Sequence, residues 1–366
     1  ALIATTVVGG VGSVRAEEGQ IPAAILINGR GYGHGRGLSQ FGAYGWATAA
    51  GWSWQQIIDF YYGGPTGNTI APVDDPGQIM TVALAALNGY QTAVVADNNN
   101  ALFLQDPVPG RTWTSLVARE QGQRVYRVWG STERKCLGAS VDPAAVGFTL
   151  IGDVPEVASF TTQVGSDSTA ATTSVIGLCE PRPNGNNKIR YYRGEIRAVN
   201  KTNNENRTIN AVGLEDYVRG VVPHESPAYW GAAAGGAGMN ALRAQAVAVR
   251  SYAATEVNRF PGLSRTCDTQ DCQVYGGAAL RESVNGAIIP QESAYTDQAV
   301  AETAGMVIRT PQGAVVRTEF SSSNGGRTAG TSFPVKVDDG DLASESVNAL
   351  LVWTRVLSAA EIVGKY

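Results

Sequence analysis

The residue best suited to chemistry is Glu225, which lies in the short segment VVPHESP. Pro223 and Pro227 stand two positions before and after it, and each proline restricts its own backbone and that of the residue before it. We expect Val221 and Val222 to end a strand and Glu225 to lie in the loop that follows. A carboxyl group held this way beside an apolar cleft has a raised pKa and stays protonated near neutral pH. The segment therefore predicts a general acid/base.

A helix is predicted after this loop, over Met239 to Glu256. Apolar residues recur at helical spacing between Leu242 and Ala253 and predict a buried face. The alanines among them keep the helix narrow, so neighbouring elements can approach it closely. Tyr229 and Trp230 lie between the loop and the helix, where we expect them to form a wall on which a sugar ring stacks.

Several further segments follow in a fixed order, and together they carry a family resemblance. The segments are EDYVRGVVPHESP at 215–227, LRAQAVAVRSYA at 242–253, CQVYGG at 272–277, AVAETAGMVI at 299–308 and TEFSSSNGGRTA at 318–329. With them the chain resembles the SpoIID/LytB group of bacterial cell-wall proteins, over residues 188–332.

A Gly-rich segment near the N-terminus, GYGHGRGLSQFGA at 31–43, also matches this family's pattern. In many relatives the motif comes at the C-terminal end of the domain, whereas here a β-rich segment of about 110 residues lies between the two parts. We expect residues 25–64 to fold back against the main domain and complete its cleft. The motif contains G-x-G-x-x-G, but no βαβ unit with a suitably placed acid follows, so a nucleotide site is not predicted.

The resemblance implies a lytic transglycosylase with Glu225 as its catalytic acid/base. Such an enzyme cleaves the bond between N-acetylmuramic acid and N-acetylglucosamine without external water and leaves a 1,6-anhydro end. It needs no cofactor and no metal. Matching positions imply that a further set of residues contacts the glycan strand: His34, Gln40, Gln245, Arg250, Gln273, Tyr275 and Ser323.

Two other functions stay open. Some relatives are described as amidase enhancers, which bind and stimulate a cell-wall amidase without being enzymes themselves. An ordinary glycan hydrolase would need a second carboxylate at about 5–10 Å from the first. Asp268, Asp271 and Glu319 are the nearest candidates for that role.

The four cysteines favour two disulfides, because an even count in an exported chain is typical of a disulfide framework. Their proximity in sequence favours Cys267 with Cys272, which leaves Cys136 with Cys179. Relatives of the family can hold a zinc ion at the first pair, and free thiols are the third alternative. The chain has only two histidines, and neither is near this pair, whereas a structural zinc site needs four ligands.

The order of predicted elements indicates an α+β fold, with a SpoIID-like catalytic domain, a substrate cleft and an inserted β-rich lobe. We expect a leader at 1–20, an N-terminal unit at 21–64, the β-rich lobe at 79–185 and the catalytic domain at 188–366. Residues 65–78 read as a linker, and 164–174 as an exposed loop.

Within these regions, serines at N-cap positions predict helices over Ser39 to Ala50, Ser53 to Tyr62 and Ser293 to Thr303. The segment KIRYYRGEIRAVN at 188–200 predicts a strand pair bent at Gly194. Residues 306–323 predict a hairpin around Pro311, Gln312 and Gly313.

The composition fits a globular exported protein. The 366 residues are 43% hydrophobic and 16% charged, and the formal net charge is −4. Because no basic block is present, nucleic acid is not a predicted partner. Residues 1–16 are small or apolar apart from Arg15, and we interpret them as part of a signal peptide cleaved after Ala16. We therefore expect a secreted or wall-associated protein whose partners are peptidoglycan glycan strands and, under the enhancer alternative, an amidase.

Overall fold

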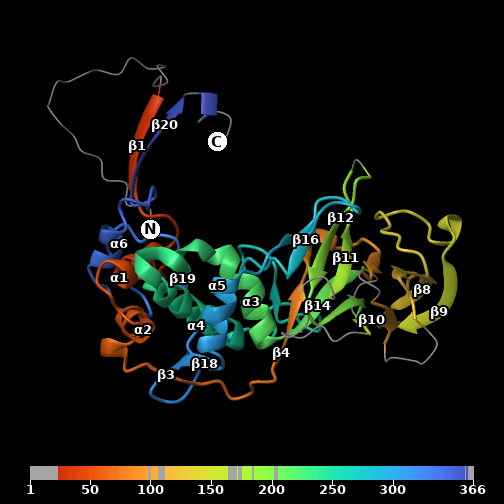
Figure 1. Cartoon of the computed structure of the whole chain (residues 1–366), viewed down its shortest axis with the longest axis horizontal. Helices are drawn as coiled ribbons and strands as arrows, with labels where there is room; N and C mark the ends of the chain where they lie inside the picture. Colours follow the sequence, from red (N-terminus) through yellow and green to blue (C-terminus); the bar gives the residue numbers. More distant parts are fainter. Residues whose placement is uncertain are drawn as a thin grey trace, which may run out of the picture.

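The computed structural model describes residues 24–361 apart from 98–99, 106–111, 164–170, 172–174, 184, 202–204 and 359. The predicted leader and nearly all of the predicted loop at 164–174 lie outside these residues. Figure 1 shows an elongated molecule with helices gathered at one end and β-sheets at the other. This mixture of helices with mainly antiparallel sheets confirms the predicted α+β class.

None of the helices in the described ranges combines the length and the apolar character needed to cross a bilayer.

Two large sheets form one end of the molecule. The first has the order β15-β4-β14-β13-β10-β6, with β4 (Ile79–Ala83), β6 (Leu102–Leu104), β10 (Val157–Thr162), β13 (Glu195–Val199), β14 (Arg207–Gly213) and β15 (Thr266–Cys267). The second has the order β17-β16-β12-β11-β5-β7-β8-β9, with β5 (Thr92–Val95), β7 (Ser115–Glu120), β8 (Val125–Ser131), β9 (Thr149–Pro155), β11 (Ile176–Glu180), β12 (Lys188–Tyr192), β16 (Ala279–Arg281) and β17 (Ile289–Pro290). Neighbouring strands run antiparallel, except that β15 runs parallel to β4.

The two sheets share one hydrophobic core. Val82 and Phe160 come from the first sheet, Leu116 and Leu178 from the second, and all four are fully buried. Removing each such side chain from water contributes about 1.5–3 kcal/mol. Strands on both sides of residues 181–187 pair in both sheets, β10 with β13 and β11 with β12. The β-rich segment therefore shares its sheets with the segment that follows it.

Helix α4 (Met239–Thr255) is the central helix of the other end, as predicted. Ala246 and Val249 join the core of the sheets together with α3 (Leu214–Glu225), whereas Leu242 and Val247 join a second core. Helix α5 (Ala294–Glu302) packs on α3 and α4, and its start after Ser293 confirms the predicted helix. Because α4 lies between two cores, it couples the sheets to the N-terminal helices.

The N-terminal helices α1 (Gln40–Thr48) and α2 (Trp54–Tyr62) begin where their serines predict. The Ser39 side chain accepts a hydrogen bond from the Gly42 N–H, and Ser53 forms a capping box with Gln56. Each cap of this kind stabilises a helix by about 1 kcal/mol.

Two strand pairs hold this N-terminal unit against the rest of the chain. Strand β2 (Leu38–Ser39) runs parallel to β19 (Phe320–Ser321), and β3 (Thr69–Pro72) runs antiparallel to β18 (Met306–Arg309). Gly37 has a φ of +64°, and a β-carbon there would collide with the Glu319 carbonyl. The close approach of the two segments therefore needs glycine at this position.

Two buried carboxylates strengthen the same contact. The Tyr61 hydroxyl donates to Asp338 Oδ2 (2.7 Å), and the Ser39 hydroxyl donates to Asp341 Oδ1 (2.9 Å). Asp341 lies in the short helix α6 (Asp339–Ala343). The N-terminal unit is thus hydrogen-bonded to a segment that lies 277 to 302 residues later in the chain.

A two-stranded ribbon joins the two ends of the described chain. Strand β1 (Ala24–Arg30) pairs antiparallel with β20 (Val352–Ser358), and the register sets Ala24 opposite Ser358. In Figure 1 the ribbon projects away from the helices.

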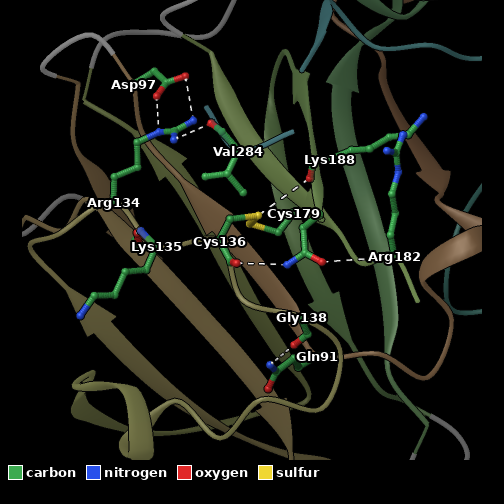
Figure 2. Close-up of a disulfide and its surroundings, with 12 residues drawn as sticks. Gln91, Asp97, Arg134, Lys135, Cys136, Gly138, Cys179, Arg182, Lys188 and Val284 are labelled. Carbon is green, nitrogen blue, oxygen red and sulfur yellow. Dashed lines mark hydrogen bonds and ion pairs between the residues drawn. A yellow bond between two sulfur atoms is a disulfide. The ribbon is translucent and has the colours of Figure 1, made fainter. Parts of the chain in front are cut away.

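Both predicted disulfides are present, Cys136–Cys179 and Cys267–Cys272. The first joins the segment after β8 to β11, an interior strand of the second sheet, and the Cys136 carbonyl accepts a hydrogen bond from the Asn187 amide (3.1 Å). Figure 2 shows Arg134, two residues earlier, between Asp97 and the Val284 carbonyl (2.9 Å). The second disulfide begins at the last residue of β15 and lies just before Val274, whose N–H reaches Glu225.

The prediction of a strand and loop at 214–225 was wrong, because this segment forms helix α3. Its valines have high strand propensity, but at helical spacing Val218, Val221 and Val222 all bury their side chains in the core. Pro223 lies inside the helix, three positions before the C-cap Ser226, and its missing N–H removes one backbone hydrogen bond from the last turn. Tertiary burial therefore overrides the local preference.

Three other expectations need correction. Strands β12 and β13 exist, but they pair with other strands in different sheets rather than with one another. The predicted linker at 65–78 contains β3. The predicted hairpin is reduced to a bridge between Arg309 and Val315, because β18 pairs with β3 and β19 pairs with β2.

The remaining elements are 3₁₀ helices at Gly64–Thr66 (η1), Ala85–Leu87 (η2), Ala144–Val146 (η3) and Ala228–Gly236 (η4), and η4 is interrupted by a kink at 233–235.

Candidate active site

Glu225 is the last residue of helix α3. The helix ends at Ser226, whose N–H donates to the Val222 carbonyl (2.9 Å). The carbonyl end of a helix carries a partial negative charge, which disfavours an ionised carboxylate beside it. The position of Glu225 on the helix thus favours the protonated form.

Both carboxyl oxygens of Glu225 accept hydrogen bonds from uncharged groups. The Val274 N–H donates to Oε1 (3.0 Å), and the Gln40 side-chain amide donates to Oε2 (3.4 Å). In the described part of the chain, no arginine or lysine forms an ion pair with this carboxyl group. Two oriented dipoles therefore hold the side chain, and no full positive charge stabilises its ionised form.

Burial raises the pKa of Glu225 above its ordinary value, and the hydrogen bonds from Val274 and Gln40 oppose this only in part. The side chain is nevertheless partly exposed, so a ligand can reach it. A protonated, accessible carboxylic acid can donate a proton and then, as a carboxylate, accept one.

A glycine in α3 allows the Val274 N–H to reach Glu225. A β-carbon at Gly220 would collide with the Tyr275 ring, and the Gly220 carbonyl accepts the Gly276 N–H (3.0 Å). The Tyr275 hydroxyl donates to Asn210 Oδ1 (2.7 Å) and thereby fixes the loop to strand β14. The loop 272–277 therefore lies directly on α3.

Gln40 comes to the same place from the other end of the sequence. It is the first residue of α1 and is buried, and the cap formed by Ser39 fixes the start of its helix. The two residues are 185 positions apart. Helices α1 and α3 thus meet at Glu225.

Gln245 is buried in α4, and neither polar atom of its side chain has a partner in the described structure. At helical spacing it lies between Leu242, in the core shared with α1, and Val249, in the core shared with α3. It therefore lies on the stripe of α4 between the two cores. A buried amide without hydrogen bonds costs about 1–3 kcal/mol of stability, so we expect the Gln245 side chain to gain a hydrogen-bond partner when a ligand binds.

The region around helices α3 and α4 is similar to a known protein family. Residues 202–309 match the family model described as Stage II sporulation protein, SpoIID. This part of the chain is similar to the SpoIID family. The matched region contains α3, α4, Glu225 and the Val274 loop, whereas Gln40 lies outside it.

Two curated relatives match parts of the chain. An uncharacterized protein of Brachyspira hyodysenteriae is 34% identical over 184 residues, which are 48% of this chain and 44% of that protein. A Bacillus subtilis protein named amidase enhancer is 33% identical over 111 residues, 30% of this chain and 12% of that protein. The chain thus spans less than half the length of either relative. No solved structure matches it.

Arg250, expected to contact substrate, is instead fully buried in a structural ion pair. Its guanidinium forms two hydrogen bonds with the Glu215 carboxylate (2.7 and 2.6 Å) and a third with the Met306 carbonyl (3.2 Å). With no exposed surface, it fixes α4 to the start of α3. We therefore exclude it from the proposed substrate site.

Three other expected contact residues also have internal partners. Gln273 accepts from the Tyr217 hydroxyl (3.1 Å), and Tyr275 stacks on Tyr217 and binds Asn210. The Ser323 hydroxyl donates to Asp341 (2.9 Å). Since all three are buried, we assign them to positioning the loops of the SpoIID domain and its neighbours rather than to binding substrate.

His34 is half-buried in the Gly-rich segment, and its Nδ1 accepts the Arg36 N–H (3.0 Å). Burial and then Arg36 lower its pKa, against an opposing effect of Glu319. The ring is therefore neutral near pH 7, with its proton on Nε2. Within the residues that the structure describes, His34 forms no hydrogen bond with Glu225, so its substrate role stays a prediction.

The expected aromatic wall is only half present. Tyr229 is strongly exposed, but Trp230 is buried against Phe41 and Tyr44 of α1. Trp230 is thus part of the second core, and only Tyr229 is available for a sugar ring.

The three carboxylates considered for a hydrolase have different environments. Glu319 forms two hydrogen bonds with Arg36 (2.6 and 2.8 Å), and these hold its pKa below the ordinary value. Asp268 accepts the Ala85 N–H (3.0 Å), and burial raises its pKa. Asp271 is exposed. In the described residues, none of them is hydrogen-bonded to Glu225 or shares a partner with it.

Sequence reasoning missed the Val274 N–H, which is the shorter of the two hydrogen bonds to Glu225. A main-chain donor leaves no side-chain signal, although its position inside CQVYGG marked the right loop.

Proposed function

We propose that this chain is a lytic transglycosylase that cleaves peptidoglycan glycan strands, with Glu225 as the single acid/base. The observation that carries the proposal is the state of the Glu225 carboxyl group. It is accessible, its pKa is raised, and its hydrogen-bond donors are uncharged. The SpoIID match and the relative named amidase enhancer support a role at the cell wall. The two disulfides support an oxidising compartment outside the cytoplasm.

In the proposed reaction, protonated Glu225 donates its proton to the glycosidic oxygen as the bond from that oxygen to C1 of the muramic acid residue breaks. The resulting carboxylate accepts the proton of the 6-hydroxyl of the same sugar, and that oxygen bonds to C1. The products are a 1,6-anhydro end and a free 4-hydroxyl, and Glu225 is again protonated. The Val274 and Gln40 donors stabilise the intermediate carboxylate.

The test is to incubate the chain with peptide-free glycan strands and to measure products by mass spectrometry. We expect 1,6-anhydro ends, and their loss in Glu225→Gln. Glu345→Gln is a matched control, because Glu345 is exposed and makes no side-chain hydrogen bond in the described structure. Reducing ends without anhydro sugars would instead indicate an ordinary hydrolase.

A non-catalytic amidase enhancer is the second candidate, favoured by the name of the Bacillus subtilis relative. It predicts no cleavage by the chain alone, stimulation of an added cell-wall amidase, and the same stimulation by Glu225→Gln. That combination of results would exclude the transglycosylase.

A further inference from the structure

A second place on the surface has the chemistry of a sugar-binding groove. It is an open cavity of about 510 Å³ between α2 and the segment before α6. The residues that line it are Trp52, Gln55, Gln56, Asp59, Phe60 and Lys336. None of these residues belongs to the SpoIID match or contacts Glu225 by a hydrogen bond.

The aromatic side of the groove is rigid. The Trp52 indole stacks on Trp46 with ring centroids 3.8 Å apart and planes 8° apart, and Phe60 meets Trp52 edge-on at 5.8 Å. One face of Trp52 is thus covered by protein, and the rest of the partly exposed indole faces the groove. Flat aromatic surface that is fixed before binding suits the C–H face of a pyranose ring, because little entropy is lost on contact.

The polar side of the groove offers donors and acceptors of both signs. Lys336 donates to the Phe60 carbonyl (2.9 Å), and its ammonium lies 4.8 Å from the Phe60 ring centroid. Asp59 uses one carboxylate oxygen to accept the Gly64 N–H (3.1 Å). The exposed Gln55 amide has no hydrogen-bond partner within the described residues. One cation and one anion cancel, so the groove suits an uncharged ligand rich in hydroxyl and amide groups.

We infer that this groove binds a β-1,4-linked chain of N-acetylated amino sugars, at a site separate from Glu225. The inference rests on the proposed function for its choice of polymer. Helix α1 links the sites, because Gln40 begins it and Trp46 lies six residues later, about 9 Å along the axis. A glycan held in the groove would therefore raise the local concentration of strands near the cleft.

The experiment uses the whole chain with Glu225→Gln, so that no strand is consumed. Chitohexaose is titrated by calorimetry into this protein and into double variants that also carry Trp52→Ala, Gln55→Ala or Asp59→Asn. We expect binding about tenfold weaker with Trp52→Ala and a few-fold weaker with either polar change. Tyr90→Ala and Gln298→Ala are the controls, since they remove an exposed aromatic and an exposed helical glutamine elsewhere. Both should leave the affinity unchanged.

Hydrogen–deuterium exchange locates the ligand. Protection of residues 52–60 supports the groove, whereas protection confined to residues 217–225 and 272–277 would overturn it. If Trp52→Ala lowers the melting temperature, the two polar variants decide the matter, because their side chains are exposed. Unchanged affinity in both would also overturn the inference.

Failure of the proposed function gives a different pattern. In that case the chain with native Glu225 produces no anhydro ends, yet Trp52→Ala still weakens chitohexaose binding. If instead cleavage depends on Glu225 and Trp52→Ala binds normally, the groove is excluded and the proposed function stands.

Discussion

Helix α3 carries a glutamate near each end, and the two have opposite surroundings. Glu215, in the first turn, accepts two hydrogen bonds from buried Arg250 and a third from the Gly305 N–H (3.0 Å). Glu225, the last residue, accepts one hydrogen bond on each oxygen from uncharged groups. The helix itself favours a negative charge at its start and disfavours one at its end. Identical side chains on one helix thus become a structural anion and a candidate acid.

The strongest test of this comparison is to change each glutamate to glutamine. For Glu225→Gln we expect a loss of cleavage of about 10²–10⁴-fold, the usual contribution of a general acid/base. Its stability should be unchanged or higher, because burial raises the pKa of Glu225 and the substitution removes a carboxylate that is unfavourable when ionised.

For Glu215→Gln we expect the reverse. It should lower the free energy of unfolding by about 3 kcal/mol, because it leaves buried Arg250 without its counter-ion. Urea denaturation of both variants measures the stabilities. The comparison fails if Glu215→Gln is as stable as the unchanged protein.

A second test uses Asp338, another carboxyl group with a raised pKa, which unlike Glu225 is completely buried. Burial raises its pKa from 3.8 to about 6, against the hydrogen bonds from Tyr61 and Asn324. Because the folded state binds this proton more tightly, the contribution is fully present below pH 3.8 and is lost as pH rises to about 6. Its size is about 3 kcal/mol.

The measurement is urea denaturation between pH 3.5 and 7, for the unchanged protein and for Asp338→Asn. The difference between the two should fall with rising pH over this window and then level off. A difference that is independent of pH would show that Asp338 titrates normally.

The smallest expected effect concerns the amide that contacts Glu225. Gln40→Ala removes a donor that favours the ionised form, so the pKa of Glu225 should rise further. The basic limb of the pH–rate profile should then move to higher pH, and the rate at the optimum should change by less than about tenfold. Gln55→Ala, on the next helix, should leave the limb in place. A limb that moves to lower pH in Gln40→Ala would mean that this amide favours the protonated acid.

Local signals in the sequence predicted the helix starts well. Ser39 and Ser53 cap the helices that they predicted. The helical spacing of apolar residues in α4 agrees with the burial of this helix between two cores. Local signals failed where distant partners decide the structure. The valines of 214–225 predict a strand from the local sequence, and only the core that buries them explains the helix. The segments of β12 and β13 predict a strand pair, because no local residue indicates that they belong to different sheets.

The same limit on prediction from local sequence applies to the residues of the candidate site. The motifs marked Glu225 and the segment of Gln40, but the residue types could not distinguish cleft residues from those that support the cleft. Arg250 and Tyr275 lie within the matching motifs and are buried with internal partners. A motif shared within a family contains residues that stabilise the fold as well as residues that take part in the chemistry. The division into a β-rich lobe at 79–185 and a catalytic domain at 188–366, and the substrate roles of His34 and Gln245, stay predictions.

The β1–β20 ribbon has a consequence for how this fold can be connected. Ala24 lies directly opposite Ser358, so a short linker would join the two ends without disturbing the cores. The chain could then be opened elsewhere, for example in the exposed turn at 74–77. In such a circular permutant the Gly-rich segment would follow the SpoIID domain, which is the order described for many relatives. Both motif orders are therefore compatible with the packing of the N-terminal unit seen in this chain.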